Sequence, residues 1–198
     1  GKKIKYRPFF VKEHKILMTM KNADANEISR IIQDLVQVCV IDEINAKNLP
    51  YFDIEYLFLQ IRAKSIGEVV DVNVNCKCGN QIKTSYSIDD LIVEKSDKHT
   101  SKIQLDANCG LIMKYPNIND AIRLFEDDNP AIVDDLIINS IEAIYDGENY
   151  WSSKDLEREK IQEFLDNLQK KHFDMIEQFF ITSPQILQVI KVKCDKCD

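Results

Sequence analysis

Apolar residues recur at helical spacing in the first third of the chain. The clearest repeat follows Asp24, which has Glu27 three residues on as in a capping box, and it predicts a helix over residues 25–40. Further helices are predicted over residues 11–20 and over the stretch between Asp53, a possible N-cap, and Gly67, a possible stop. The apolar face of the clearest helix consists of Ile28, Ile31, Ile32, Leu35 and Cys39.

Beyond Gly67 the spacing of the apolar residues changes from helical to every second residue, as in a β-strand. Two alternating runs, 70–74 and 82–88, flank the turn-forming sequence Cys76-Lys77-Cys78-Gly79-Asn80. This pattern predicts a β-hairpin with two cysteines at its tip. A second pair of strands is predicted over residues 103–105 and 111–115.

In the remainder of the chain the apolar residues return to helical spacing, and they alternate with polar residues once more near the C-terminal end. Asn129 as cap and Pro130 at the first helical position predict a helix that runs to Asp146-Gly147. Ser152 or Ser153 is predicted to cap the next helix, whose apolar face continues to the break at Ser183-Pro184. Residues 188–193 alternate as a strand that leads directly into Cys194 and Cys197.

These elements predict an α+β fold in which two helical groups surround a small antiparallel β region with a zinc-ribbon-like knuckle of four cysteines. We expect four regions along the chain: an N-terminal helical region, a β-hairpin region with the first cysteine couple, a C-terminal helical region, and a terminal strand with the second couple that packs on the β region. Their predicted bounds are 1–68, 69–116, 117–187 and 188–198.

Composition and charge narrow the class of protein. The 198 residues include 26 basic and 33 acidic side chains, a net charge of −7, which argues against a protein that binds by covering phosphates. No apolar run approaches the roughly 18 residues of a membrane span, and no signal peptide is recognisable, so we expect a reducing cytoplasm and no membrane partner. Nucleic acid is an unlikely main partner on the same grounds.

The sequence offers little for catalysis. Its five glycines leave no room for a phosphate-binding loop, and its three histidines are scattered singly. We therefore predict no catalytic residues, no cofactor-binding residues, no small-molecule substrate and no enzymatic activity.

Four of the six cysteines form two couples, Cys76-x-Cys78 and Cys194-x-x-Cys197, separated by 115 residues. Each couple follows a predicted strand, as in a zinc ribbon, so we predict a structural zinc ion held by all four thiolates with no open position. Unligated thiols, adventitious pairs, and a redox role for the second couple are the alternatives, although the redox motif normally opens a helix. Cys39 and Cys109 are interpreted as packing residues.

Two groups of basic and polar residues suggest where partners could bind. Arg62, Lys64 and Ser65 lie together at the end of the third predicted helix and could form a partner-binding edge. A second group lies near the cysteines and supports the alternative of a zinc-ribbon nucleic-acid-binding protein. Its members are Lys77, Lys83, Lys191, Lys193 and Lys196.

The run from Leu49 through Phe52-Asp53-Ile54-Glu55-Tyr56-Leu57-Phe58 to Arg62-Ala63-Lys64-Ser65-Ile66-Gly67-Glu68 resembles the baseplate hub protein family of T-even-like bacteriophages. Landmarks elsewhere agree in order, among them Arg7-Pro8-Phe9, Cys76 to Gly79, Met113-Lys114-Tyr115-Pro116 and Ile144-Tyr145-Asp146-Gly147. The resemblance implies a non-enzymatic hub subunit or hub assembly protein of a contractile phage tail. It implies further baseplate and tail hub proteins as partners, with assembly in the host cytoplasm and a final location in the virion tail baseplate.

Overall fold

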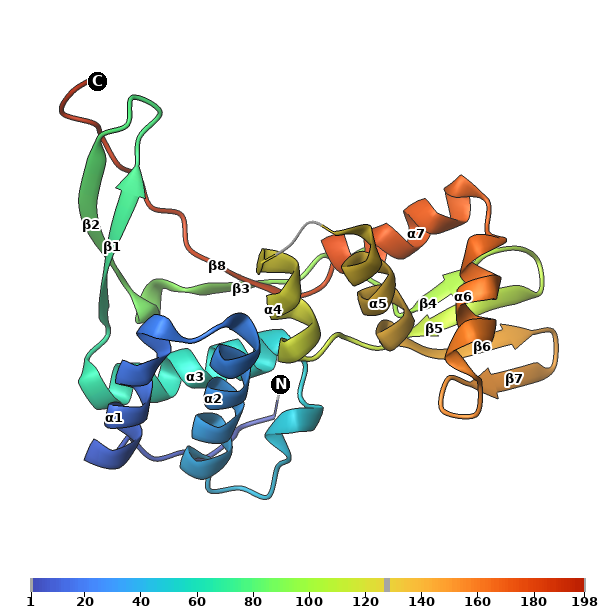
Figure 1. Ribbon diagram of the computed structural model, residues 1–198, viewed down its shortest axis with the longest axis horizontal. Helices are drawn as coiled ribbons and strands as arrows, with labels where there is room; N and C mark the ends of the chain where they lie inside the picture. Colours follow the sequence, from blue (N-terminus) through green and yellow to red (C-terminus); the bar gives the residue numbers. More distant parts are fainter. Residues whose placement is uncertain (1, 127–128, 198) are drawn as a thin grey trace.

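The computed structural model describes residues 2–126 and 129–197, which form seven α-helices and three small antiparallel sheets (Figure 1). The predicted α+β class is confirmed. Figure 1 shows a helical body formed mainly by the N-terminal part of the chain, a second body of sheet and helices, and a hairpin that projects away from both. The predicted β region of residues 69–116 is therefore not one sheet, since its strands divide among all three sheets.

The N-terminal body is built from four helices. They are α1 (Val11–Thr19), α2 (Ala25–Cys39), α3 (Tyr51–Ile66) and α4 (Ile118–Glu126), with short 3-10 helices η1 (Met20–Asn22) and η2 (Ala46–Asn48) between them. The side chain of Asp24 accepts a hydrogen bond from the backbone N–H of Glu27 at 2.8 Å, which confirms the predicted cap of α2. The buried faces of α2, α3 and α4 meet in one core that includes Val36, Ile54 and Ile118.

Two features of this body differ from the sequence-based expectation. Helix α3 begins at Tyr51 with Pro50 as its extended N-cap, so Asp53 lies in the first turn and is not the cap. Helix α4 lies in the predicted C-terminal helical region of residues 117–187, but no separate helix was predicted there, and it packs in the N-terminal core instead. Its start is held by Asn117, whose side-chain oxygen accepts hydrogen bonds from the backbone N–H groups of Asn119 and Asp120 at 2.8 and 3.1 Å.

The second body is a four-stranded antiparallel sheet with three helices. Its strands, in spatial order, are β4 (Lys102–Gln104), β5 (Cys109–Met113), β6 (Ile141–Asp146) and β7 (Asn149–Ser152), and its helices are α5 (Pro130–Ser140), α6 (Arg158–Asp166) and α7 (Lys170–Ile181). Leu111 of β5 lies opposite Ile144 of β6, and both belong to a core completed by Ile161 and Phe179. The helices bury their apolar side chains against this sheet.

Three predictions for the C-terminal half are wrong. The helix predicted to reach Asp146 stops at Ser140, because Ile141 and the residues after it pair with β5 as strand β6. Ser152 lies in β7 and caps no helix, and α6 begins after Glu157 instead. Residues 188–193 form no strand, whereas the strand β8 comprises Gln185–Leu187.

The two bodies are joined by a two-stranded ribbon and by aromatic side chains. After the turn η3 (Ile88–Asp90), β3 (Ile92–Glu94) pairs antiparallel with β8. Phe52 of α3 contacts Tyr115 edge to face at 4.9 Å between ring centroids, and Tyr115 stacks on Phe179 of α7 at 5.6 Å. The hydroxyl of Tyr115 and the Nε2 atom of His99 are also hydrogen-bonded at 2.9 Å. Helices from both bodies thus share one aromatic contact.

The segment before α1 is fastened to the N-terminal body by polar contacts. Glu13, the one buried residue of α1, accepts hydrogen bonds from the Arg7 guanidinium at 3.1 Å and from the backbone N–H of Phe10 at 2.7 Å. The Ser65 hydroxyl of α3 accepts a bond from the backbone N–H of Phe9 at 2.8 Å. Burial opposes the ionisation of Glu13, but these donors outweigh it and hold the pKa of its carboxyl below the ordinary value of 4.5.

We expect Glu13→Gln to lower the melting temperature at pH 7, with a difference that shrinks as the pH falls. A lowered pKa in the folded state means that the carboxylate contributes stability above pH 4.5 and loses it as the pH falls through the folded-state pKa. Thermal melts of both proteins between pH 7 and pH 3 measure this. The exposed Glu148→Gln is the control and should follow the parent, whereas a pH-independent difference for Glu13→Gln would contradict the assignment.

Candidate metal centre

The first cysteine couple lies in the turn of the projecting hairpin, as predicted. Strands β1 (Val69–Asn75) and β2 (Gln81–Ser87) pair in register along their whole length, from Val69 opposite Ser87 to Asn75 opposite Gln81. The backbone N–H of Cys76 donates to the carbonyl of Asn80 at 2.8 Å, and that of Gly79 donates to the carbonyl of Cys76 at 2.9 Å. Gly79 has φ +80°, which glycine adopts without strain. The turn thereby holds both thiols at one end of the hairpin.

The second couple reaches the same place from the other end of the chain. Figure 1 shows the segment after β8 running alongside the hairpin, so that the C-terminal end lies beside its tip. Cys194 to Cys197 form a turn there, in which the backbone N–H of Lys196 points at the sulfur of Cys194 at 3.5 Å. Two segments more than a hundred residues apart in sequence therefore meet through their cysteines.

The structure brings all four predicted ligand residues together. The Sγ atoms of Cys76 and Cys197 are 3.5 Å apart, those of Cys78 and Cys194 are 3.7 Å apart, and all four lie within 4.8 Å of one another. A tetrahedral zinc ion with bonds of about 2.3 Å places its sulfurs about 3.8 Å apart. The observed separations fit that arrangement and are far longer than the roughly 2.05 Å of a disulfide. Four cysteines are thus close enough to hold a metal ion.

Hydrogen bonds prepare one of these sulfurs for ionisation. The backbone N–H of Lys196 and the side-chain amide of Asn80 both donate to Cys194, the latter at 3.6 Å, and lower the pKa of its thiol to about 6. Hydrogen bonding with the neighbouring thiols acts in the opposite sense on Cys197 and raises its pKa to about 12. A cation among the sulfurs would favour full ionisation of the cluster, because a metal ion replaces the thiol protons.

Asn80 is the one member of this site that the sequence-based reasoning missed. It stands directly after Gly79 and points its amide across the gap to the opposite couple. Its position directly after the glycine of the cysteine turn could have indicated a role in the site. The acceptor of its hydrogen bond, the sulfur of Cys194, comes close only when the C-terminal segment docks on the hairpin. Asn80 therefore helps to orient the thiol of Cys194 from outside the group of four cysteines.

The remaining candidate residues lie elsewhere. Cys39 is fully buried in the N-terminal core and Cys109 is half-buried against the second core, and burial raises the pKa of both thiols. At the end of α3, Arg62 donates to the carbonyl of Gly67 at 3.0 Å, and Lys64 pairs with Glu68 at 3.8 Å. The predicted partner-binding edge is thus partly occupied by contacts within the chain.

Comparison with known proteins agrees with the family resemblance. The sequence matches the family described as T4 bacteriophage base plate protein over residues 1–198. It is 27% identical over 201 residues to the baseplate hub assembly protein gp26 of Enterobacteria phage T4, a similarity that covers all of this chain and 86% of that protein. No solved structure matches the fold. Among the described residues, no helix combines the length and apolarity that crossing a bilayer would need.

The chain belongs to the T4 bacteriophage base plate protein family, and the predicted membership in a phage baseplate family is confirmed. Neither the family nor the relative supports the nucleic-acid-binding alternative.

Proposed function

We propose that this chain is a non-enzymatic structural or assembly component of a phage tail baseplate hub, acting through contacts with other baseplate and tail hub proteins. The family match over the whole chain carries this proposal. The name of the T4 relative, a baseplate hub assembly protein, supports the more specific placement at the hub. Its place of action is the host cytoplasm during assembly and the tail baseplate thereafter.

A structural zinc ion is part of the same proposal. Cys76, Cys78, Cys194 and Cys197 supply four thiolates at separations that suit a tetrahedral ion. Because protein sulfurs fill all four positions, such a site stabilises the fold and leaves no place for a substrate. The ion would fix the projecting hairpin against the C-terminal segment and so present one rigid surface, which loses less entropy on binding a partner.

A phage with a stop codon early in the gene for this chain tests the proposed function. We expect infected cells to accumulate the other baseplate subunits without complete hubs, and a plasmid-borne copy of the gene to restore them. Sucrose-gradient sedimentation and electron microscopy of the lysates measure the outcome. Complete baseplates formed without the chain would refute the proposal. Mass spectrometry of purified particles then separates a resident subunit from an assembly factor that leaves.

A further inference from the structure

Helix α1 presents most of its apolar side chains to solvent and buries a carboxylate. Val11 is 72% exposed, Ile16 is 45% exposed and Met18 is 53% exposed, whereas Glu13 is 3% exposed. A nine-residue helix normally gains its stability from a buried apolar stripe, and α1 is held instead by the contacts of Glu13. Three of its four large apolar side chains are thus exposed, and only Leu17 is partly buried.

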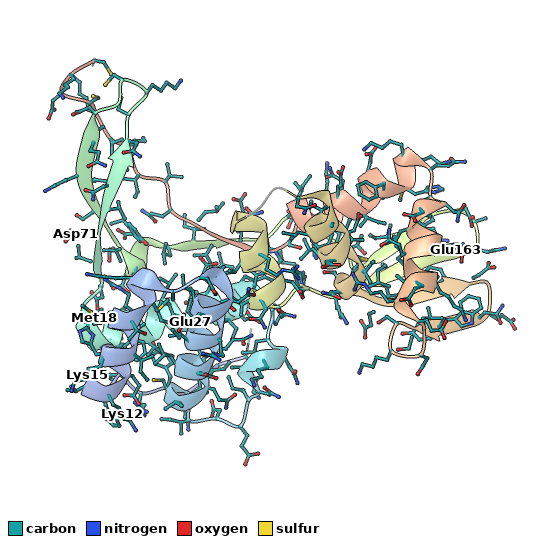
Figure 2. All side chains as sticks on the ribbon, viewed as in Figure 1. Lys12, Lys15, Met18, Glu27, Asp71 and Glu163 are labelled. Carbon is teal, nitrogen blue, oxygen red and sulfur yellow. The ribbon has the colours of Figure 1, made fainter. Side chains whose placement is uncertain are left out.

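The outward side of α1 mixes apolar and basic residues. Val11, Lys15 and Met18 are spaced i, i+4 and i+7 and so form one stripe, with Lys12 and His14 beside it. Figure 2 shows Lys12, Lys15 and Met18 along this outer side of the N-terminal body. We call these five residues the α1 face.

The charge of the chain is strongly divided between this end and the rest. Residues 1–21 carry seven Lys and Arg and one acidic residue, a charge of +6, while residues 22–198 carry −13, which together give −7. Within the described part of the chain, Lys12 approaches Glu13 at 3.7 Å and Lys15 forms no ion pair. The positive charge of the α1 face is therefore largely unpaired with carboxylates, although the protein as a whole is acidic.

We propose that the α1 face docks on an acidic surface of a neighbouring baseplate protein, with Lys12 and Lys15 meeting carboxylates and Val11 and Met18 entering apolar depressions between them. This inference rests on the proposed function and names the chemistry of the partner. Charge complementarity selects the acidic surface, because the positive end of the chain is its main departure from net negative charge.

A protein surface fits the α1 face better than a membrane or a nucleic acid. A helix that lies in a bilayer interface needs a continuous apolar face, and here Lys15 interrupts the stripe between Val11 and Met18. Binding to phosphates alone would leave both apolar side chains in water. A protein surface accommodates the two kinds of side chain side by side, as in the core and rim of an ordinary interface.

The face is also held in place before any partner arrives. The preceding segment is tied to α3 through the hydrogen bond from Phe9 to Ser65, and Arg7 lies 4.2 Å above the ring of Phe10. These contacts restrict the helix without using its outward side chains. Binding therefore costs little ordering of the backbone.

The test uses the full chain and the other baseplate proteins of the same phage, each purified and assayed separately by biolayer interferometry at 50 and 300 mM salt. Three double variants are compared with the parent: Lys12→Glu/Lys15→Glu, Val11→Ser/Met18→Ser, and the control Lys154→Glu/Lys171→Glu. The control makes the same charge change at exposed positions of the second body. Circular dichroism verifies that all variants fold.

We expect an acidic baseplate protein to bind the parent and the control equally, and to bind each α1 double variant about tenfold more weakly or worse. Added salt should weaken parent binding more than binding of the charge-reversed variant. Baseplate binding that is unaffected by the α1 variants would overturn this inference and leave the proposed function standing. If no baseplate protein binds the parent chain, the result would count against both this inference and the proposed function. Binding only to anionic vesicles, to duplex DNA or to a second copy of the chain would overturn the acidic-protein assignment.

Discussion

Changing Cys194 and Cys197 together to Ser should remove the zinc ion from the purified protein and free residues 188–197 from the hairpin, while both helical bodies stay folded. The effect should be local because neither Cys194, although it is buried, nor Cys197 belongs to either hydrophobic core. A two-stranded hairpin is at best marginal in water without further packing, so β1 and β2 should exchange their amide hydrogens much faster in the variant. Elemental analysis and hydrogen-exchange mass spectrometry measure the two effects.

The matched control is Cys109→Ser, which makes the same atomic change at a half-buried cysteine outside the cluster. It should retain one zinc ion per chain and the exchange protection of the hairpin. Acid should release the metal from the parent, because protons compete with zinc for the thiolates. A parent protein that contains no metal after expression in zinc-supplemented medium, or a double variant that keeps it, would contradict the proposed centre.

Gly110→Ala should destabilise the second body, lowering the free energy of unfolding by roughly 2–4 kcal/mol. A methyl group at this position would overlap the hydroxyl and ring of Tyr145 and the backbone carbonyl of Ile103, which flank Gly110 on the two neighbouring strands. The aromatic ring takes the space that a side chain on β5 would need, as in the covering of strand glycines by aromatic residues. Urea unfolding followed by circular dichroism measures the loss.

The double variant Gly110→Ala/Tyr145→Ala separates the two causes of this loss. Relative to Tyr145→Ala alone, the added methyl group should cost less than it costs the parent, because only the overlap with the Ile103 carbonyl remains. An unfolding midpoint of Gly110→Ala equal to that of the parent would show that the strands separate without penalty, contrary to this explanation.

The elements that were predicted correctly are those whose caps, turns and apolar spacing lie within their own sequence. Helix α2 has a capping side chain, Asp24, and a long apolar repeat, and the β1–β2 hairpin has two alternating runs around Gly79. The gathering of the cysteine couples was also predicted, because each couple follows alternating residues and thiols in a reducing compartment favour metal. Spacing alone therefore indicated which four cysteines lie close together.

The elements that were missed depend on distant partners. Ile141 and Ile144 continue the helical spacing of α5, and only pairing with β5 decides that they form a strand. Residues 188–193 alternate like a strand, but they belong to none of the three sheets that the described residues form. Helix α4 is short, and its burial depends on packing against α2 and α3. Local patterns cannot supply these contacts.

The separation of the cysteine couples also sets an order of events during synthesis. Cys78 leaves the ribosome 116 residues before Cys194, which corresponds to roughly ten seconds at ordinary rates of translation. Throughout that interval the hairpin lacks the second cysteine couple, whereas α2 and α3 can already pack against each other. The four sulfurs assemble after α7 and β8 have been made, so the hairpin is completed last. A chain truncated before residue 194 would therefore carry both folded bodies and a hairpin without the second cysteine couple.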